Sequence, residues 1–195
     1  RKSRGLGDVY KRQAIDSLSF VLSALIVFSI NKNLSEKSEN KKEEDISYKE
    51  GLKYAASKKE IFSLIITKAT FSISASGLLS LFTVLSYDIY KTGDFGTGLM
   101  FAARGIGALI GPIAIRYFFG SSDGKLLNTI GITIMTWGLF YFFIPFSMSL
   151  YLTVLLLILG HSGGGSQWAF STYGLQVLTP DRLRGRIAGI DSVSY

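Results

Sequence analysis

The feature that most restricts the fold of this chain is a series of long apolar stretches with very few charged residues. The hydrocarbon core of a bilayer is about 30 Å thick, and an α-helix needs about 20 apolar residues to cross it. Four stretches of the sequence reach that length, namely residues 61–87, 96–118, 126–146 and 150–178. The pattern therefore predicts a membrane protein whose first partner is the lipid bilayer.

These stretches are expected to be helices and not the strands of a barrel. Each is a continuous apolar run, whereas barrel strands alternate polar and apolar residues and need only about 10 positions. A helix also satisfies its backbone hydrogen bonds within one segment, as lipid requires. A shorter apolar segment at residues 14–30 and another that begins at residue 187 extend the series. The predicted fold class is all-α and polytopic, and the chain is expected to be a fragment because the last helix stops at Tyr195.

The positions of lysine and arginine predict how the helices are oriented. Residues 31–60, 116–125 and 179–186 would alternate on one side and together carry thirteen lysines and arginines, whereas the other connections carry only Lys91. Short loops rich in Lys and Arg remain in the cytoplasm. The three basic segments are therefore predicted to be cytoplasmic loops of a multi-pass protein of the inner (plasma) membrane.

The first thirteen residues differ in character from the rest of the chain. Residues 3–13, SRGLGDVYKRQ, resemble the translated sequence of a transposase sequencing adapter. We interpret residues 1–13 as an adapter-derived artefact and exclude them from fold reasoning; a basic targeting peptide and a native loop are the alternatives. Without their five basic residues and one acidic residue, the net charge falls from +7 to +3. Nucleic acid is therefore not an expected partner.

Residues 31–60 form the one long hydrophilic stretch. Up to Ile46 they combine both charge signs with few large apolar residues, which predicts a disordered or loosely helical linker. From Ser47 onward, apolar and aromatic residues recur at helical spacing. This second part is predicted to be an amphipathic helix at the membrane surface.

A polar break with the sequence TPDRLRGRIAGI follows the last long stretch, at residues 179–190. Pro180 lacks an N–H and ends the preceding helix, while the negative charge of Asp181 favours the first turn of the next one. The motif on the predicted cytoplasmic side comprises Asp181, Arg182, Arg184, Gly185 and Arg186.

Three segments together carry a resemblance to a known family: AIDSLSFVLSALIVFSI, GLKYAASKKEIF and QVLTPDRLRGRIAGI. They resemble the major facilitator superfamily permeases, and within them the bacterial enterobactin-exporter-like and macrolide-efflux-like group. The resemblance implies a fragment of a twelve-helix bundle, with residues 14–30 as transmembrane helix 6 and residues 31–60 as the central loop. Residues 61–195 would be a partial C-terminal half, with helices 7–10 and the start of helix 11. It also implies two partners, a small-molecule substrate and the missing N-terminal half of the same protein.

The stretch 96–118 contains a glycine pattern that is similar to the glycine-rich motif of superfamily antiporters. Gly98, Gly107, Gly111 and Pro112 have the matching spacing, although that motif belongs on helix 5 and this stretch would be helix 8. Small residues let helix backbones pack closely, and a proline permits a bend. Simple close packing and a conformational role in antiport both remain open.

Two basic residues lie deep within predicted membrane helices. Arg104 is eight residues inside its stretch, and Lys68 is similarly deep. A charge at such depth is costly unless it faces the bundle interior, a cavity or a partner. Each could bind an anionic group of the substrate, or could be a structural pair or a snorkelling side chain. The four stretches hold no acidic residue, so a proton-carrying carboxylate is expected in the N-terminal half.

The last stretch contains ILGHSGGGSQWAF, with the only histidine of the chain, His161. The histidine could titrate near neutral pH or hydrogen-bond between helices, and Gln167 and Trp168 could line a substrate cavity. A lone histidine without cysteine predicts no metal site and no cofactor. The run GHSGGGS lacks the Lys-Ser/Thr of a phosphate loop, and an enzyme is not expected.

The leading hypothesis is a secondary active transporter, a proton-coupled exporter of a drug-like compound or siderophore. It rests on the family resemblance. An uptake or lipid-transfer permease of the same fold is the first alternative. A non-transporting membrane scaffold or sensor is the second.

Overall fold

The computed structural model describes residues 2–29, 47–119 and 125–193, and all regular structure in these ranges is helical. The chain divides into two compact units, Arg1–Glu43 and Glu44–Tyr195. Residues 31–46 of the predicted cytoplasmic segment 31–60 and residues 120–124 of the segment 116–125 lie outside the described ranges, as does residue 30 of the predicted helix 14–30.

The first unit contains one helix, α1, which runs from Lys2 to Ser29. The predicted segments 1–13 and 14–30 therefore share a single helix as far as Ser29. The apolar part of α1 is Gln13–Ser29, which is shorter than the membrane-length helices of the second unit.

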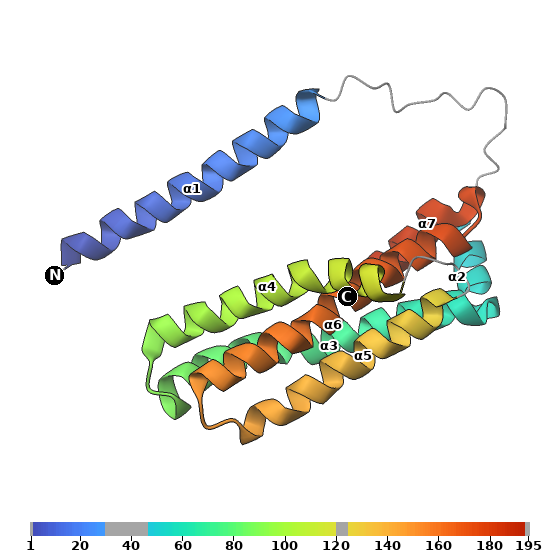
Figure 1. Ribbon diagram of the computed structural model, residues 1–195. Coiled ribbons are helices and arrows are strands. Elements are labelled where there is room, and N and C mark those ends of the chain that lie inside the picture. The colour runs from blue at the N-terminus through green and yellow to red at the C-terminus, as the bar shows by residue number, and fades with distance from the viewer. Residues whose placement is uncertain (1, 30–46, 120–124, 194–195) are drawn as a thin grey trace. The chain divides into compact units, whose positions relative to one another are not determined.

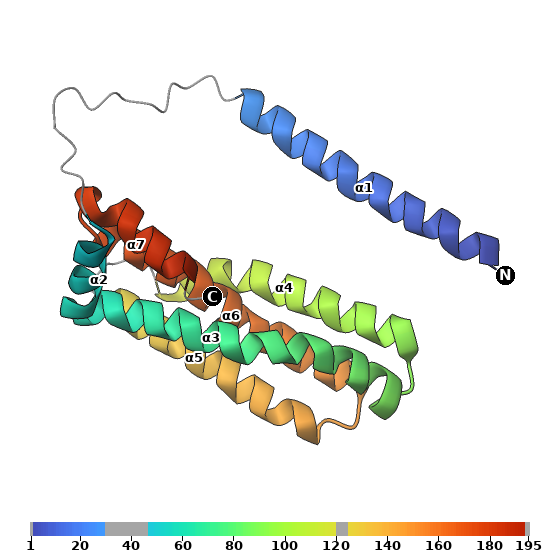
Figure 2. The same cartoon turned by 180° about the vertical axis from the view of Figure 1, so that it is seen from behind.

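The described part of the second unit is built on four long antiparallel helices (Figures 1 and 2). They are α3 (Lys59–Val84), α4 (Gly93–Phe119), α5 (Leu126–Phe143) and α6 (Leu150–Leu178). Helix α6 is the centre of the bundle because it contacts each of the other three, most extensively α4. The bundle confirms the predicted all-α, polytopic fold.

Three of the four predicted spans are both long and apolar enough to cross a membrane: Lys59–Ile89, Gly93–Phe118 and Leu126–Phe146. They include two short extensions, the π-helical turn η1 (Leu85–Ile89) and the 3₁₀ turn η3 (Ile144–Phe146). Helix α6 has 29 residues, about 43 Å at 1.5 Å per residue, but it is not among the three helices that are apolar enough to cross a membrane. Its small and polar residues are mostly buried between helices, which is where a membrane helix can carry them.

Two shorter helices complete the second unit, α2 (Tyr48–Ser57) and α7 (Asp181–Val193). At one end of the bundle α3 and α5 begin, and α4 and α6 end (Figure 1). We call this the basic end, because the described parts of the predicted cytoplasmic segments lie there. The predicted surface helix is α2, and it packs against α7 with Gly51 and Ala55 buried. An apolar cluster that includes Ile61, Leu64, Leu183 and Ile187 fills the basic end.

The opposite end has its own apolar cluster, which includes Phe82, Met100 and Leu157. Tyr90 links the two connections there, since its hydroxyl lies 3.1 Å from the Ser147 carbonyl oxygen and 2.6 Å from Thr153 Oγ1. Packed apolar side chains therefore lie at both ends of the described bundle.

Candidate functional site

The first polar cluster inside the bundle joins α4, α5 and α6. Arg104 Nε donates a hydrogen bond of 3.0 Å to His161 Nε2, and Tyr141 Oη lies 2.8 Å from His161 Nδ1. His161 is buried, whereas Arg104 and Tyr141 are partly exposed. The predicted deep arginine and the only histidine are thus direct neighbours, which the sequence did not indicate.

The geometry of this cluster fixes the protonation of the imidazole. A guanidinium nitrogen always donates, so His161 Nε2 must accept. The ring hydrogen then resides on Nδ1, which faces the Tyr141 hydroxyl, and the ring is neutral. Of the described residues, no carboxylate lies within ion-pair distance of Arg104. The cluster therefore holds one partly exposed positive charge whose terminal guanidinium nitrogens can still donate to a ligand.

The second polar cluster contains a buried ion pair between α3 and α7. Lys68 Nζ lies 2.5 Å from Asp191 Oδ2, and the two side chains are only 1% and 10% exposed. Lys68 also donates to Thr172 Oγ1 at 3.2 Å, and its ammonium lies 4.4 Å from the centre of the Trp168 ring. Lys68 is therefore engaged on two helices besides its own.

Asp191 is the functional candidate that sequence reasoning missed. The sequence prediction considered acidic residues only within the four long apolar stretches, and Asp191 lies beyond them on α7. A signal was present, because Leu183, Ile187 and Asp191 recur every four residues and form the buried face of α7. An acidic residue in register with buried apolar residues indicates that its side chain also points inward.

The glycines of α4 differ in their surroundings. Gly107 and Gly111 face α6, where an added Cβ would lie 2.9 Å from His161 Cβ and 2.5 Å from Ser162 Cα, respectively. Gly98 is exposed, and an added Cβ there would meet no atom within 4 Å. Pro112 lies inside α4, which continues to Phe119. Gly107 and Gly111 therefore lie where α4 packs closely on α6, while Gly98 takes no part in the described packing.

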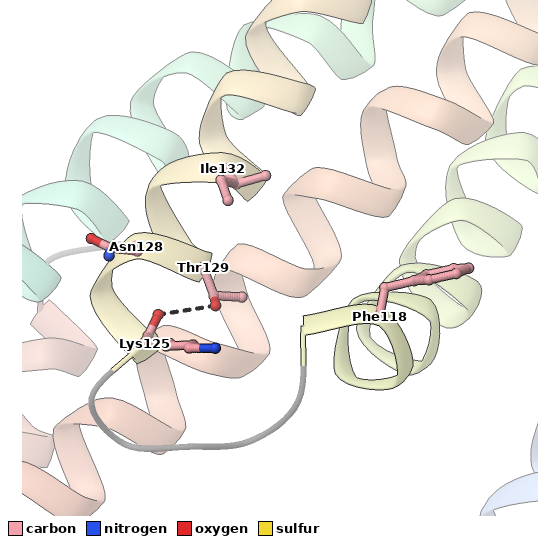
Figure 3. A pocket seen from close by; sticks show the side chains of 5 residues that line it. All are labelled: Phe118, Lys125, Asn128, Thr129 and Ile132. Carbon is pink, nitrogen blue, oxygen red and sulfur yellow. Dashed lines mark hydrogen bonds between the residues drawn. The ribbon is translucent and has the colours of Figure 1, made fainter.

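The structure places Gln167 and Trp168 side by side in sequence on α6, with Gln167 buried and Trp168 half-buried. Gln167 is fully buried and donates to Ser171 Oγ at 3.2 Å, while its Oε1 has no hydrogen-bond partner among the described residues. An open hollow of about 300 Å³ lies near the basic end, between Phe118 of α4 and the first turns of α5 (Figure 3). Its lining includes none of the predicted substrate-pathway residues.

The basic motif that follows α6 forms the start of α7. Arg184 pairs with Asp181 at 2.6 Å and Arg182 with Glu50 of α2 at 3.8 Å, and both pairs are exposed. Exposed pairs of this kind contribute at most about 1 kcal/mol. Arg186 lies against Gly51, where an added Cβ would be 2.9 Å from the arginine Cβ. Gly185 is exposed, with open space around it.

Membrane-length helices with charged and polar groups between them are the features of a multi-pass membrane protein. A family model described as transmembrane secretion effector, of the major facilitator type, matches residues 8–193, and the chain belongs to this family. No curated protein and no solved structure matches the chain. The family match supports a permease. The exporter subgroup and the adapter origin of residues 3–13 stay predictions.

Proposed function

We propose that the chain is part of a proton-coupled exporter in the inner membrane, which extrudes a drug-like compound or siderophore without changing it chemically. In this proposal residues 61–195 belong to the second of two six-helix halves. The halves move against each other and open a central site to alternate sides of the membrane. The basic end would face the cytoplasm.

The observation that carries the proposal is the Arg104–His161–Tyr141 cluster. A purely structural arginine in a membrane helix would be matched by a carboxylate, because an unmatched charge in a low-dielectric interior is costly. Arg104 is held instead by a neutral imidazole, so its positive charge remains available. A partly exposed guanidinium in this arrangement is suited to bind an anionic group of a substrate.

The test uses the full-length gene that contains this sequence, expressed in a bacterial host that lacks its own drug and siderophore exporters. The wild type is expected to lower the accumulation of at least one drug or siderophore. Arg104→Ala should lose about tenfold or more of the extrusion rate with normal membrane insertion. The expected loss follows from a hydrogen bond to a charged group, which contributes about 1.5–3 kcal/mol.

Arg116→Ala is the matched control, because Arg116 is an exposed arginine in the last part of the same helix. It should leave extrusion unchanged. Higher accumulation in the wild type than in the empty host would indicate an uptake permease. Unchanged accumulation of every compound in both directions would favour a scaffold or sensor, and equal extrusion by Arg104→Ala and the wild type would remove Arg104 from the substrate path.

A further inference from the structure

Three groups of the described residues contact the Lys68 ammonium from two helices, and each of them suits a positive charge. Asp191 on α7 supplies a carboxylate at 2.5 Å. Thr172 and Trp168 lie one turn apart on α6 and supply a hydroxyl oxygen at 3.2 Å and an aromatic face at 4.4 Å. We call Trp168, Thr172 and Asp191 the ammonium cradle.

The chemistry of the cradle is that of a binding site for organic ammonium ions. A carboxylate gives a charge-assisted hydrogen bond, and an aromatic face attracts a cation most strongly when the pair is removed from water. An ammonium group has three donors and no acceptor, so the threonine hydroxyl oxygen adds a second acceptor. Lys68 is buried to 1% exposure, and its side chain fills the cradle with a four-carbon amine.

We propose that the ammonium cradle is a binding site for the alkylammonium group of a small molecule, and that Lys68 is its tethered occupant in this conformation. The inference rests on the proposed function for its physiological meaning, because it assigns an amine-bearing compound as the substrate class. The binding itself requires only Trp168, Thr172 and Asp191.

The surroundings of the cradle permit such an exchange. Trp168 and Thr172 are half-buried, and the Asp191 side chain retains 10% exposure, so the cradle is not sealed. The Lys68 ammonium is attached to the backbone through a flexible four-carbon side chain. A tethered group competes at a high effective concentration, so a free amine binds weakly while Lys68 is present and more tightly when it is shortened.

The experiment measures binding to the purified chain in lipid nanodiscs. The sequence has two tryptophans, and Trp137→Phe leaves Trp168 as the single fluorophore, directly beneath the ammonium. In this background Lys68→Ala removes the resident amine. Titration with n-butylammonium chloride, which matches the lysine stem, should then give a saturable change in Trp168 emission at a concentration on the order of 1–10 mM.

The controls separate ammonium binding from general effects. Sodium chloride and 1-butanol should give no saturable change, and Lys59→Ala, at an exposed lysine in the first turn of the same helix, should behave like the Trp137→Phe parent. Adding Asp191→Asn to Lys68→Ala should weaken n-butylammonium binding at least tenfold. Because no transport is measured, a failed export assay leaves this result intact, and a failed titration leaves the export assay intact.

Three results would overturn the proposal. One is a response to n-butylammonium that is no larger than the response to 1-butanol, and another is the same half-saturation concentration with and without Asp191→Asn.

The folding of Lys68→Ala gives a second test. If this variant yields folded protein only when it is prepared in n-butylammonium, the amine occupies the cradle. The third adverse result is that Lys68→Ala does not fold even in n-butylammonium, whereas the Lys68→Ala/Asp191→Asn double variant folds. In the Lys68-containing parent, saturation is expected at an amine concentration about tenfold or more higher than in Lys68→Ala.

Discussion

Gly111→Ala should weaken the bundle more than any other single methyl group added along α4. An added Cβ at Gly111 would lie 2.5 Å from Ser162 Cα and closer still to Ser162 O, whereas ordinary contact begins at 3.4 Å. The neighbour is backbone in the middle of α6, so the two helices must separate by at least about 0.9 Å to restore an ordinary contact with Ser162 Cα. A gap of 0.5–1 Å removes roughly a quarter to a half of the dispersion energy at each contact, and α4–α6 is the largest helix contact. We expect a loss of about 3 kcal/mol in the free energy of unfolding, at the upper end of typical overpacking costs.

The assay is equilibrium unfolding of the 195-residue chain in mixed micelles with increasing dodecyl sulfate, followed by circular dichroism. Gly105→Ala is the matched control, because an added Cβ there meets nothing within 4 Å in the same helix. It should leave the stability unchanged or raise it by up to about 1 kcal/mol, the usual difference between Gly and Ala inside a helix. Equal stability of the two variants would refute the conclusion that Gly111 is required for close helix packing.

Two further predictions concern α7. Asp191→Asn should lower the free energy of unfolding by about 3–5 kcal/mol, because it leaves Lys68 buried without its carboxylate. In a double-mutant cycle, adding Lys68→Met to Asp191→Asn should recover more than half of that loss. A double variant as unstable as the sum of the single variants would show that the two residues are not coupled. Gly51→Leu should push α2 away from α7 and accelerate tryptic cleavage after Lys53 several-fold, measured by mass spectrometry. Ala56→Leu, at an exposed position of the same helix, should leave the cleavage rate unchanged, and equal rates in both variants would contradict the α2–α7 packing.

The hydropathy of the sequence alone predicts much of the fold. The predicted stretch 150–178 coincides with α6, and the stretch 126–146 coincides with α5 and η3 together. These bounds were predictable because the length and apolarity of a segment are local properties, and lipid excludes nearly every backbone structure except the helix. The break at Pro180 was predictable for the same reason, since it depends on one missing N–H.

The candidate sites were only partly predictable, because they depend on which helix faces meet. Arg104 and His161 were each selected for their depth, but their contact joins residues 57 apart. Lys68 and Asp191 are 123 residues apart, and no local pattern pairs them. Gly98 and Gly111 belong to one glycine pattern, yet only Gly111 faces another helix.

The position of α7 has a mechanical consequence. The helix is held at its first turns by α2, through Glu50 and Gly51, and near its last turn by Lys68 in the middle of α3. The ten residue steps from Asp181 to Asp191 span about 15 Å along the helix axis, and a short continuous helix bends little over that length. A push on α2 at the basic end would therefore move the Asp191 carboxylate relative to Lys68. Helix α7 thus joins the surface helix α2 to the buried Lys68–Asp191 ion pair within one continuous element.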